Sequence, residues 1–141
     1  MIHMVTLLIG KKGPGKTKRL IEEANAAVAA SNGSVVVIEK GAKLTYDLTH
    51  KARLVDTDAY KIKGYDALYG FLSGICAGNY DVTDIFVDST FKIAGNDKAE
   101  LAAFVTKLNV LADDANTTIT LLISSSKDDL PSDLNATLEE M

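Results

Sequence analysis

Four short runs of apolar and β-branched residues recur along the chain, and none of them alternates with polar residues as a half-buried strand does. They cover Met4–Ile9, Val35–Glu39, Ile85–Asp88 and Thr118–Ile123. Runs of this kind are typical of parallel strands that are buried on both faces of a sheet. The pattern therefore predicts four core strands.

Three stretches between these runs carry apolar residues at helical spacing. Their apolar stripes extend over Leu20–Val28, Tyr65–Cys76 and Leu101–Leu111. In each stripe the apolar residues recur at intervals of three and four positions, which places them on one face of a helix. We expect three amphipathic helices, each of which packs against the predicted sheet.

Glycines and an aspartate mark the ends of these helices. Gly33 and Gly78 follow the first and second stripes, where a helix commonly stops. Asp97 precedes the third stripe and Glu100 follows three positions later, as in a capping box. These signals fix the boundaries of the predicted helices.

The alternation of strands and helices predicts an α/β fold. Successive strands with helical crossovers form a mainly parallel sheet, here of about four to five strands, with helices on both faces in a three-layer α/β/α arrangement. No repeat or long linker interrupts residues 1–141, so we expect a single domain. Ligands of such sheets bind at the carboxyl ends of the strands.

Two segments carry weaker patterns. Residues Lys40–Lys63 mix basic residues with aspartates, and Leu44–Leu48 alternates against Arg53–Val55 as a short hairpin would. A solvated ribbon at the sheet edge explains these charges, and a contact with phosphate or a partner is the alternative. Pro131 can begin a short final helix.

Composition and charge restrict the classes of partner. The chain has 141 residues, a formal net charge of −4 and a pI of about 5.1, which argues against a protein that coats nucleic acid. Cys76 is the single cysteine, and the first apolar run ends too early for a signal peptide or a membrane span. We therefore expect a cytoplasmic protein without a membrane partner.

The strongest motif is a glycine-rich loop after the first apolar run. It satisfies G-x-x-x-x-G-K-S/T at every fixed position, with Lys18 directly after it: Gly10, Lys11, Lys12, Gly13, Pro14, Gly15, Lys16 and Thr17. Such loops turn backbone N–H groups toward phosphate oxygens at a helix N-terminus, while the lysine reaches the β- and γ-phosphates. The alternative is a basic turn whose lysines are only solvated.

A metal ligand is expected opposite this loop. The Thr17 hydroxyl would bind Mg²⁺, and Asp88 stands where the third apolar run ends. A carboxylate at the end of a neighbouring strand can hold the same ion. The alternative for Asp88 is a turn-forming or helix-capping aspartate.

These motifs give the chain a resemblance to P-loop NTPases. "VVVIEK" and "IFVDST" are similar to the RecA-like branch, and the thymidine-kinase-like core is a more distant match. The resemblance implies that Glu39 polarises the attacking water and that Asp88 holds the metal. It also implies that Ser124, after the fourth run, senses the γ-phosphate. Glu39 as a strand-end surface residue and Ser124 as a loop residue are the alternatives.

The predicted function is binding of ATP, with GTP as a second choice, together with Mg²⁺. Slow or partner-stimulated hydrolysis by Lys16 and Glu39 is the first mechanism, with a protein partner or a homo-oligomer supplying any missing group. Ser89 follows Asp88 where many such ATPases have glutamate, which favours a nucleotide-dependent interaction module as the alternative. A small-molecule kinase is the second alternative.

Overall fold

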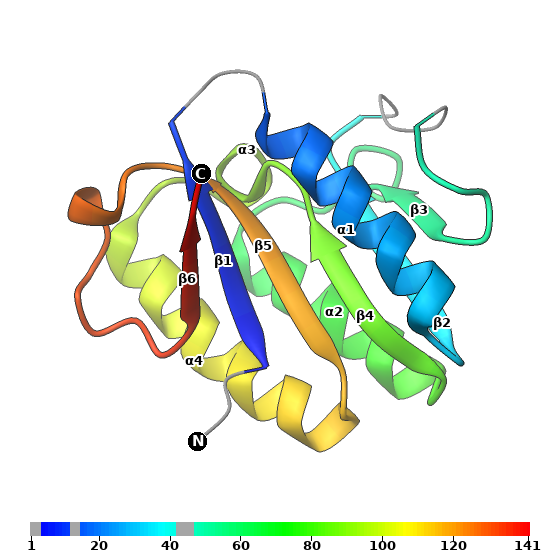
Figure 1. Cartoon of the computed structure of the whole chain (residues 1–141). Coiled ribbons are helices and arrows are strands. Elements are labelled where there is room, and N and C mark those ends of the chain that lie inside the picture. Colours follow the sequence, from blue (N-terminus) through cyan, green and yellow to red (C-terminus); the bar gives the residue numbers. More distant parts are fainter. Residues whose placement is uncertain (1–3, 12–14, 42–46) are drawn as a thin grey trace.

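A computed structural model describes residues 4–11, 15–41 and 47–141. Within these ranges six parallel strands form one sheet, in the order β3-β2-β4-β5-β1-β6 (Figure 1). The strands are β1 (Val5–Gly10), β2 (Ser34–Glu39), β3 (Arg53–Asp56), β4 (Val82–Val87), β5 (Thr118–Ser124) and β6 (Thr137–Glu140). The helices are α1 (Lys16–Ala30), α2 (Tyr65–Gly78), α3 (Thr90–Ala94) and α4 (Lys98–Ala115).

Helices cover both faces of the sheet. Helix α1 lies on one face and α2 and α4 lie on the other (Figure 1). On the first face Leu20 packs with Val37 of β2, and on the second Leu68 and Leu108 join a larger cluster that includes Ile38. Successive residues of β2 thus enter different layers, as expected of a strand that is buried on both faces.

The predicted fold class is confirmed as α/β with a parallel sheet, and the arrangement is consistent with three α/β/α layers. All four predicted core strands and all three predicted helices are present, with ends that shift by up to a few residues. Asp97 caps α4 as expected, because its Oδ1 accepts a hydrogen bond from the Glu100 N–H at 3.0 Å. The sheet has six strands rather than four to five.

Two local predictions were wrong. Arg53–Asp56 pairs in parallel with β2 instead of forming a hairpin, and Leu48 belongs to no strand, while Leu44 and Tyr46 lie outside the described residues. Pro131 begins no helix, and the segment after it ends in β6, which pairs with β1. In both places backbone pairing with a strand already present outweighs a weak local pattern.

The strand order decides which side chains meet at the carboxyl edge. Strand β5 lies between β1, which leads into the glycine loop, and β4, which leads to Asp88. Gly10 is in register with Ser124, and Val87 is in register with Leu121. The glycine loop, Ser124 and Asp88 therefore follow three neighbouring strands at the same edge.

None of the helices in the described ranges is long and apolar enough to cross a membrane.

Candidate phosphate-binding site

The glycine loop leads from the carboxyl end of β1 to the first turn of α1. Gly10, Lys11, Gly15, Lys16 and Thr17 belong to the described residues, and the predicted contacts of Lys12, Gly13 and Pro14 fall outside them. Gly15 has a φ of +118°, a conformation that side chains disfavour, and α1 begins with the next residue. The strand, loop and helix thus follow one another as the motif requires.

Lys16 lies in a narrow space over Gly10. A Cβ atom at Gly10 would come within 3.0 Å of Lys16 Cδ, so glycine allows the lysine side chain to cross the end of β1. The Lys16 side chain is buried, and its Nζ donates a hydrogen bond to the Lys11 carbonyl oxygen at 2.5 Å. Burial lowers the pKa of Lys16, and the charge of Asp88 opposes this effect.

Thr17 and Asp88 meet although 71 positions separate them in the sequence. Thr17 Oγ1 lies 3.5 Å from Asp88 Oδ1, and Ser89 Oγ donates to Asp88 Oδ2 at 3.1 Å. Asp88 is buried, whereas Thr17 is exposed. The structure therefore brings together the two residues that the sequence predicts as metal ligands.

Glu39 ends β2 beside Asp88. Ile38 is in register with Val87, and the Asp88 N–H donates to the Ile38 carbonyl oxygen at 2.8 Å, so Glu39 and Asp88 occupy adjacent positions. Because side chains alternate along a strand, both carboxylates fall on the face that α1 covers. Glu39 is 1% exposed, so the alternative that it is a surface residue was wrong.

Ser124 and Lys18 are both exposed, and the structure places them differently. Ser124 ends β5 and lines a cavity of about 440 Å³ together with Ser89 and Phe91, next to Asp88. Lys18 is the third residue of α1 and has no described contact with the other site residues. Ser124 thus lies at the candidate site, whereas nothing in the structure assigns Lys18 a role.

The described side chains at this edge offer too few ligands to hold a metal ion alone, but they fit a magnesium ion that phosphate also coordinates. Among the described residues no three His, Cys, Asp or Glu side chains gather as metal ligands. Thr17 Oγ1 and Asp88 Oδ1 offer two oxygens, and Mg²⁺ is usually held by one or two protein oxygens together with substrate phosphates and water. A group with its own phosphate oxygens would complete the coordination.

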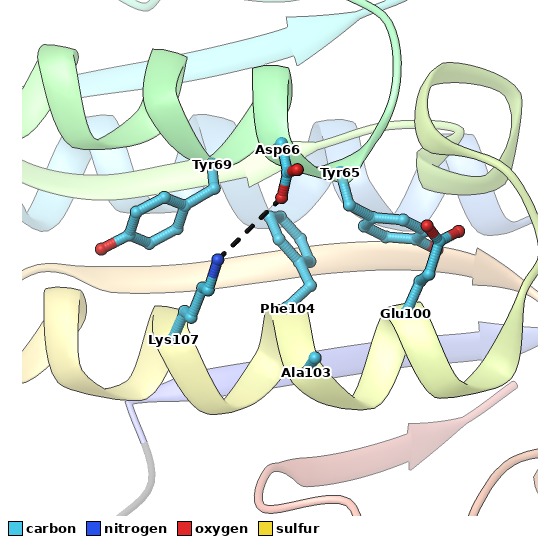
Figure 2. Close-up of a pocket in the computed structure, with 7 residues that line it drawn as sticks. All are labelled: Tyr65, Asp66, Tyr69, Glu100, Ala103, Phe104 and Lys107. Carbon is cyan, nitrogen blue, oxygen red and sulfur yellow. Dashed lines mark ion pairs between the residues drawn. The ribbon is translucent and has the colours of Figure 1, made fainter.

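A small pocket between α2 and α4 offers a contrast (Figure 2). Its volume is about 80 Å³, and Lys107 approaches both Asp66, at 4.0 Å, and the Tyr69 ring, at 5.3 Å to the centroid. The Tyr65 hydroxyl donates to the Gly95 carbonyl oxygen at 2.7 Å, and burial raises the pKa of Tyr65. The side chains that line this pocket pack α2 against α4, and its small volume leaves little room for a ligand.

Sequence reasoning missed two features of the carboxyl edge. The buried hydroxyls of Thr57 and Thr90 have no hydrogen-bond partner among the described residues, and they follow β3 and β4. Lys61, Lys63 and Lys92 line a second cavity there. Lys61 and Lys63 lie two positions apart, so the sequence alone could have indicated a basic segment. Only the fold shows that Lys92 lines the same cavity.

No protein-family model matches the chain, and a search of curated proteins found no significant relative.

Proposed function

We propose that the chain binds ATP with Mg²⁺ and hydrolyses it slowly, or faster when a partner completes the site. The approach of Thr17 Oγ1 to Asp88 Oδ1 carries this proposal. This approach places a hydroxyl oxygen and a carboxylate oxygen together directly after the glycine loop. Two such oxygens could hold one Mg²⁺ ion beside a phosphate that the loop binds.

Each residue of the loop has a role in this proposal. The first turn of α1 directs its free N–H groups and its partial positive charge toward the phosphates. Lys16, which now donates to the Lys11 carbonyl oxygen, would turn its Nζ to phosphate oxygens instead. Thr17 and Asp88 would hold Mg²⁺, which supplies positive charge to the phosphate oxygens.

Glu39 is the proposed general base for hydrolysis. Its position beside Asp88 supports this assignment, because both carboxylates belong to the face that α1 covers. Ser89, which follows Asp88, cannot accept a proton comparably. The residue next to the metal ligand therefore adds no second base, which supports slow turnover.

The arginines of the chain support the dependence on a partner. Arg19 forms an ion pair with Glu139 at 2.8 Å, and Arg53 begins β3 at the sheet edge. Neither arginine is placed to stabilise charge that develops on the γ-phosphate. A second copy or another protein would supply such a group. We also propose a cytoplasmic location, which the buried free thiol of Cys76 supports.

Binding is tested by calorimetric titration with ATP in the presence and absence of Mg²⁺. We expect Lys16→Ala to weaken Mg²⁺-ATP binding roughly a hundredfold, because charge-assisted contacts to phosphate are lost. Lys107→Ala is the matched control, since Lys107 lies between α2 and α4 and should leave the affinity unchanged. Equal affinity of Lys16→Ala and the parent would refute the proposal.

Hydrolysis is tested by phosphate release from the Glu39→Gln variant. Glutamine keeps the shape of the side chain but accepts no proton, so we expect a rate at least about a hundredfold lower with ATP affinity retained. An unchanged rate would rule out Glu39 as the base. A parent protein that binds ATP but releases no phosphate, alone or with partners, would favour the nucleotide-dependent interaction module, for which Ser89 is the supporting observation.

A further inference from the structure

A second cavity opens at the carboxyl edge, beyond β2 and β3. Its volume is about 480 Å³, within the range of small-ligand sites. Segments that follow β2 and β3 line it together with α3. Five charged residues surround it, and we call this cavity the lysine pocket: Lys40, Asp58, Lys61, Lys63 and Lys92.

The charges of the lysine pocket are unbalanced. Lys40 Nζ pairs with Asp58 Oδ1 at 2.7 Å, whereas Lys61, Lys63 and Lys92 form no ion pair with any described residue. Residues 1–3, 12–14 and 42–46, which lie outside the described ranges, include no aspartate or glutamate. Three lysines therefore line one cavity without an anionic partner among the described residues.

Backbone contacts hold these lysines near one another. The Ile62 N–H donates to the Thr57 carbonyl oxygen at 3.0 Å, and Lys61 has a φ of +57°, in the left-handed region. The Gly64 N–H donates to the Ile93 carbonyl oxygen at 3.1 Å, which ties this turn to α3 beside Lys92. Like charges on a free surface tend to spread apart, but here the fold keeps them around one cavity.

We propose that the lysine pocket binds a small phosphorylated molecule at a site separate from the proposed nucleotide site. Lysine ammonium groups bind phosphate as compact point charges. A long polyanion such as nucleic acid needs an extended basic surface, and a chain of net charge −4 argues against one. Lysines that are confined to one cavity fit a small anionic ligand better. Lys92 also lines the cavity beside Ser89 and Ser124, so the two sites adjoin.

The test is a titration with inorganic pyrophosphate in the absence of metal, followed by the NMR chemical shifts of the backbone amides. We expect these chemical shifts to change at residues 61–63 and 92–93, independently of any change at residues 15–18. In the Lys61→Gln/Lys92→Gln variant, the shifts at residues 61–63 and 92–93 should report pyrophosphate affinity that is at least about tenfold weaker. The reason is that two charge-assisted contacts are lost. Lys107→Gln should bind as the parent does, since this lysine lies elsewhere.

A Lys16→Ala background separates this inference from the proposed function. There the shifts at residues 61–63 and 92–93 should remain, whether or not the glycine loop binds phosphate. The inference is overturned if these residues do not shift, or if the double lysine variant and Lys107→Gln respond alike. It is also overturned if sodium chloride at equal ionic strength produces the same shifts, because the effect would then be one of general screening.

Discussion

Polar residues lie at both the amino ends and the carboxyl ends of the parallel strands, but their hydrogen bonding differs between these two edges. At the amino edge, Thr117 Oγ1 donates to the Val82 carbonyl oxygen at 2.8 Å, and Thr118 Oγ1 donates to Asp84 Oδ1 at 2.6 Å. Ser31 and Thr83 share a further hydrogen bond there. These polar groups satisfy one another and hold the ends of the strands together.

At the carboxyl edge, some buried polar groups lack a hydrogen-bond partner among the described residues. Thr57 and Thr90 carry buried hydroxyls without a partner among the described residues, and Lys61 faces a cavity. Lys16 is buried, and its ammonium group donates to the Lys11 carbonyl oxygen. Unsatisfied buried groups are costly for folding, so they persist where a ligand or water completes them. The comparison favours a structural role for the amino edge, and it supports the binding that we propose at the carboxyl edge.

The largest effect is expected from Asp88→Asn at the carboxyl edge. Asparagine keeps the hydrogen-bonding shape but loses the charge, so Mg²⁺-ATP affinity should fall by about 2–3 kcal/mol, roughly a hundredfold. Asp84→Asn is the matched control at the amino end of the same strand, and it should bind normally. Titrations with EDTA should abolish the difference between Asp88→Asn and the parent. A loss of equal size in EDTA would contradict the metal assignment.

Gly33→Ala at the amino edge should show the opposite behaviour. A Cβ there would lie 1.9 Å from the Asp81 carbonyl oxygen, so the chain must shift. We expect the free energy of unfolding to fall by about 2–3 kcal/mol, with ATP affinity unchanged in the folded fraction. Denaturant unfolding measures the loss.

Gly74→Ala is the control for this substitution, because its Cβ would meet no atom within 4 Å and α2 should gain helix propensity. If Gly33→Ala proved as stable as Gly74→Ala, the amino edge would not have the structural role that we assign to it.

The smallest effect is a pH dependence of binding. Burial lowers the pKa of Lys16 from its ordinary 10.5, so this side chain loses its proton at a lower pH than it would in water. ATP affinity should therefore fall as the pH rises through the lowered value. In the absence of ATP, the stability of the protein depends on pH in the opposite direction. Because the folded state favours neutral Lys16, the free energy of unfolding rises as the pH increases from the lowered pKa to 10.5.

Titrations at increasing pH measure this dependence, and Lys16→Arg should lack it because arginine stays protonated. An identical alkaline loss in Lys16→Arg would assign the effect to another group.

The sequence predicted the carboxyl edge well where chemistry and periodicity coincide. The glycine loop, the helix that begins at Lys16, and Asp88 at the end of a buried strand were all readable, because each follows an apolar run that can only be buried. The meeting of Thr17 with Asp88 then follows from the parallel topology, which gathers the carboxyl ends of strands at one edge.

The rest depends on pairing between distant segments. Strand β6 contains Glu139 and Glu140 and has no apolar run, so only its pairing with β1 reveals it. The lysine pocket joins Lys61 and Lys63 to Lys92 through the contact between Gly64 and Ile93, which no local pattern encodes. The burial of Glu39 likewise depends on its neighbours rather than on its own propensity.

Paramagnetic broadening by Mn²⁺ with a non-hydrolysable ATP analogue tests the central claim most directly. Mn²⁺ replaces Mg²⁺ at oxygen sites, and it broadens the amide signals of nearby residues. We predict selective loss of signals from Lys16, Thr17, Asp88 and Ser89, with the amino-edge residues Gly33, Thr117 and Thr118 unaffected. Uniform broadening at both edges, or broadening that spares Thr17 and Asp88, would contradict the account.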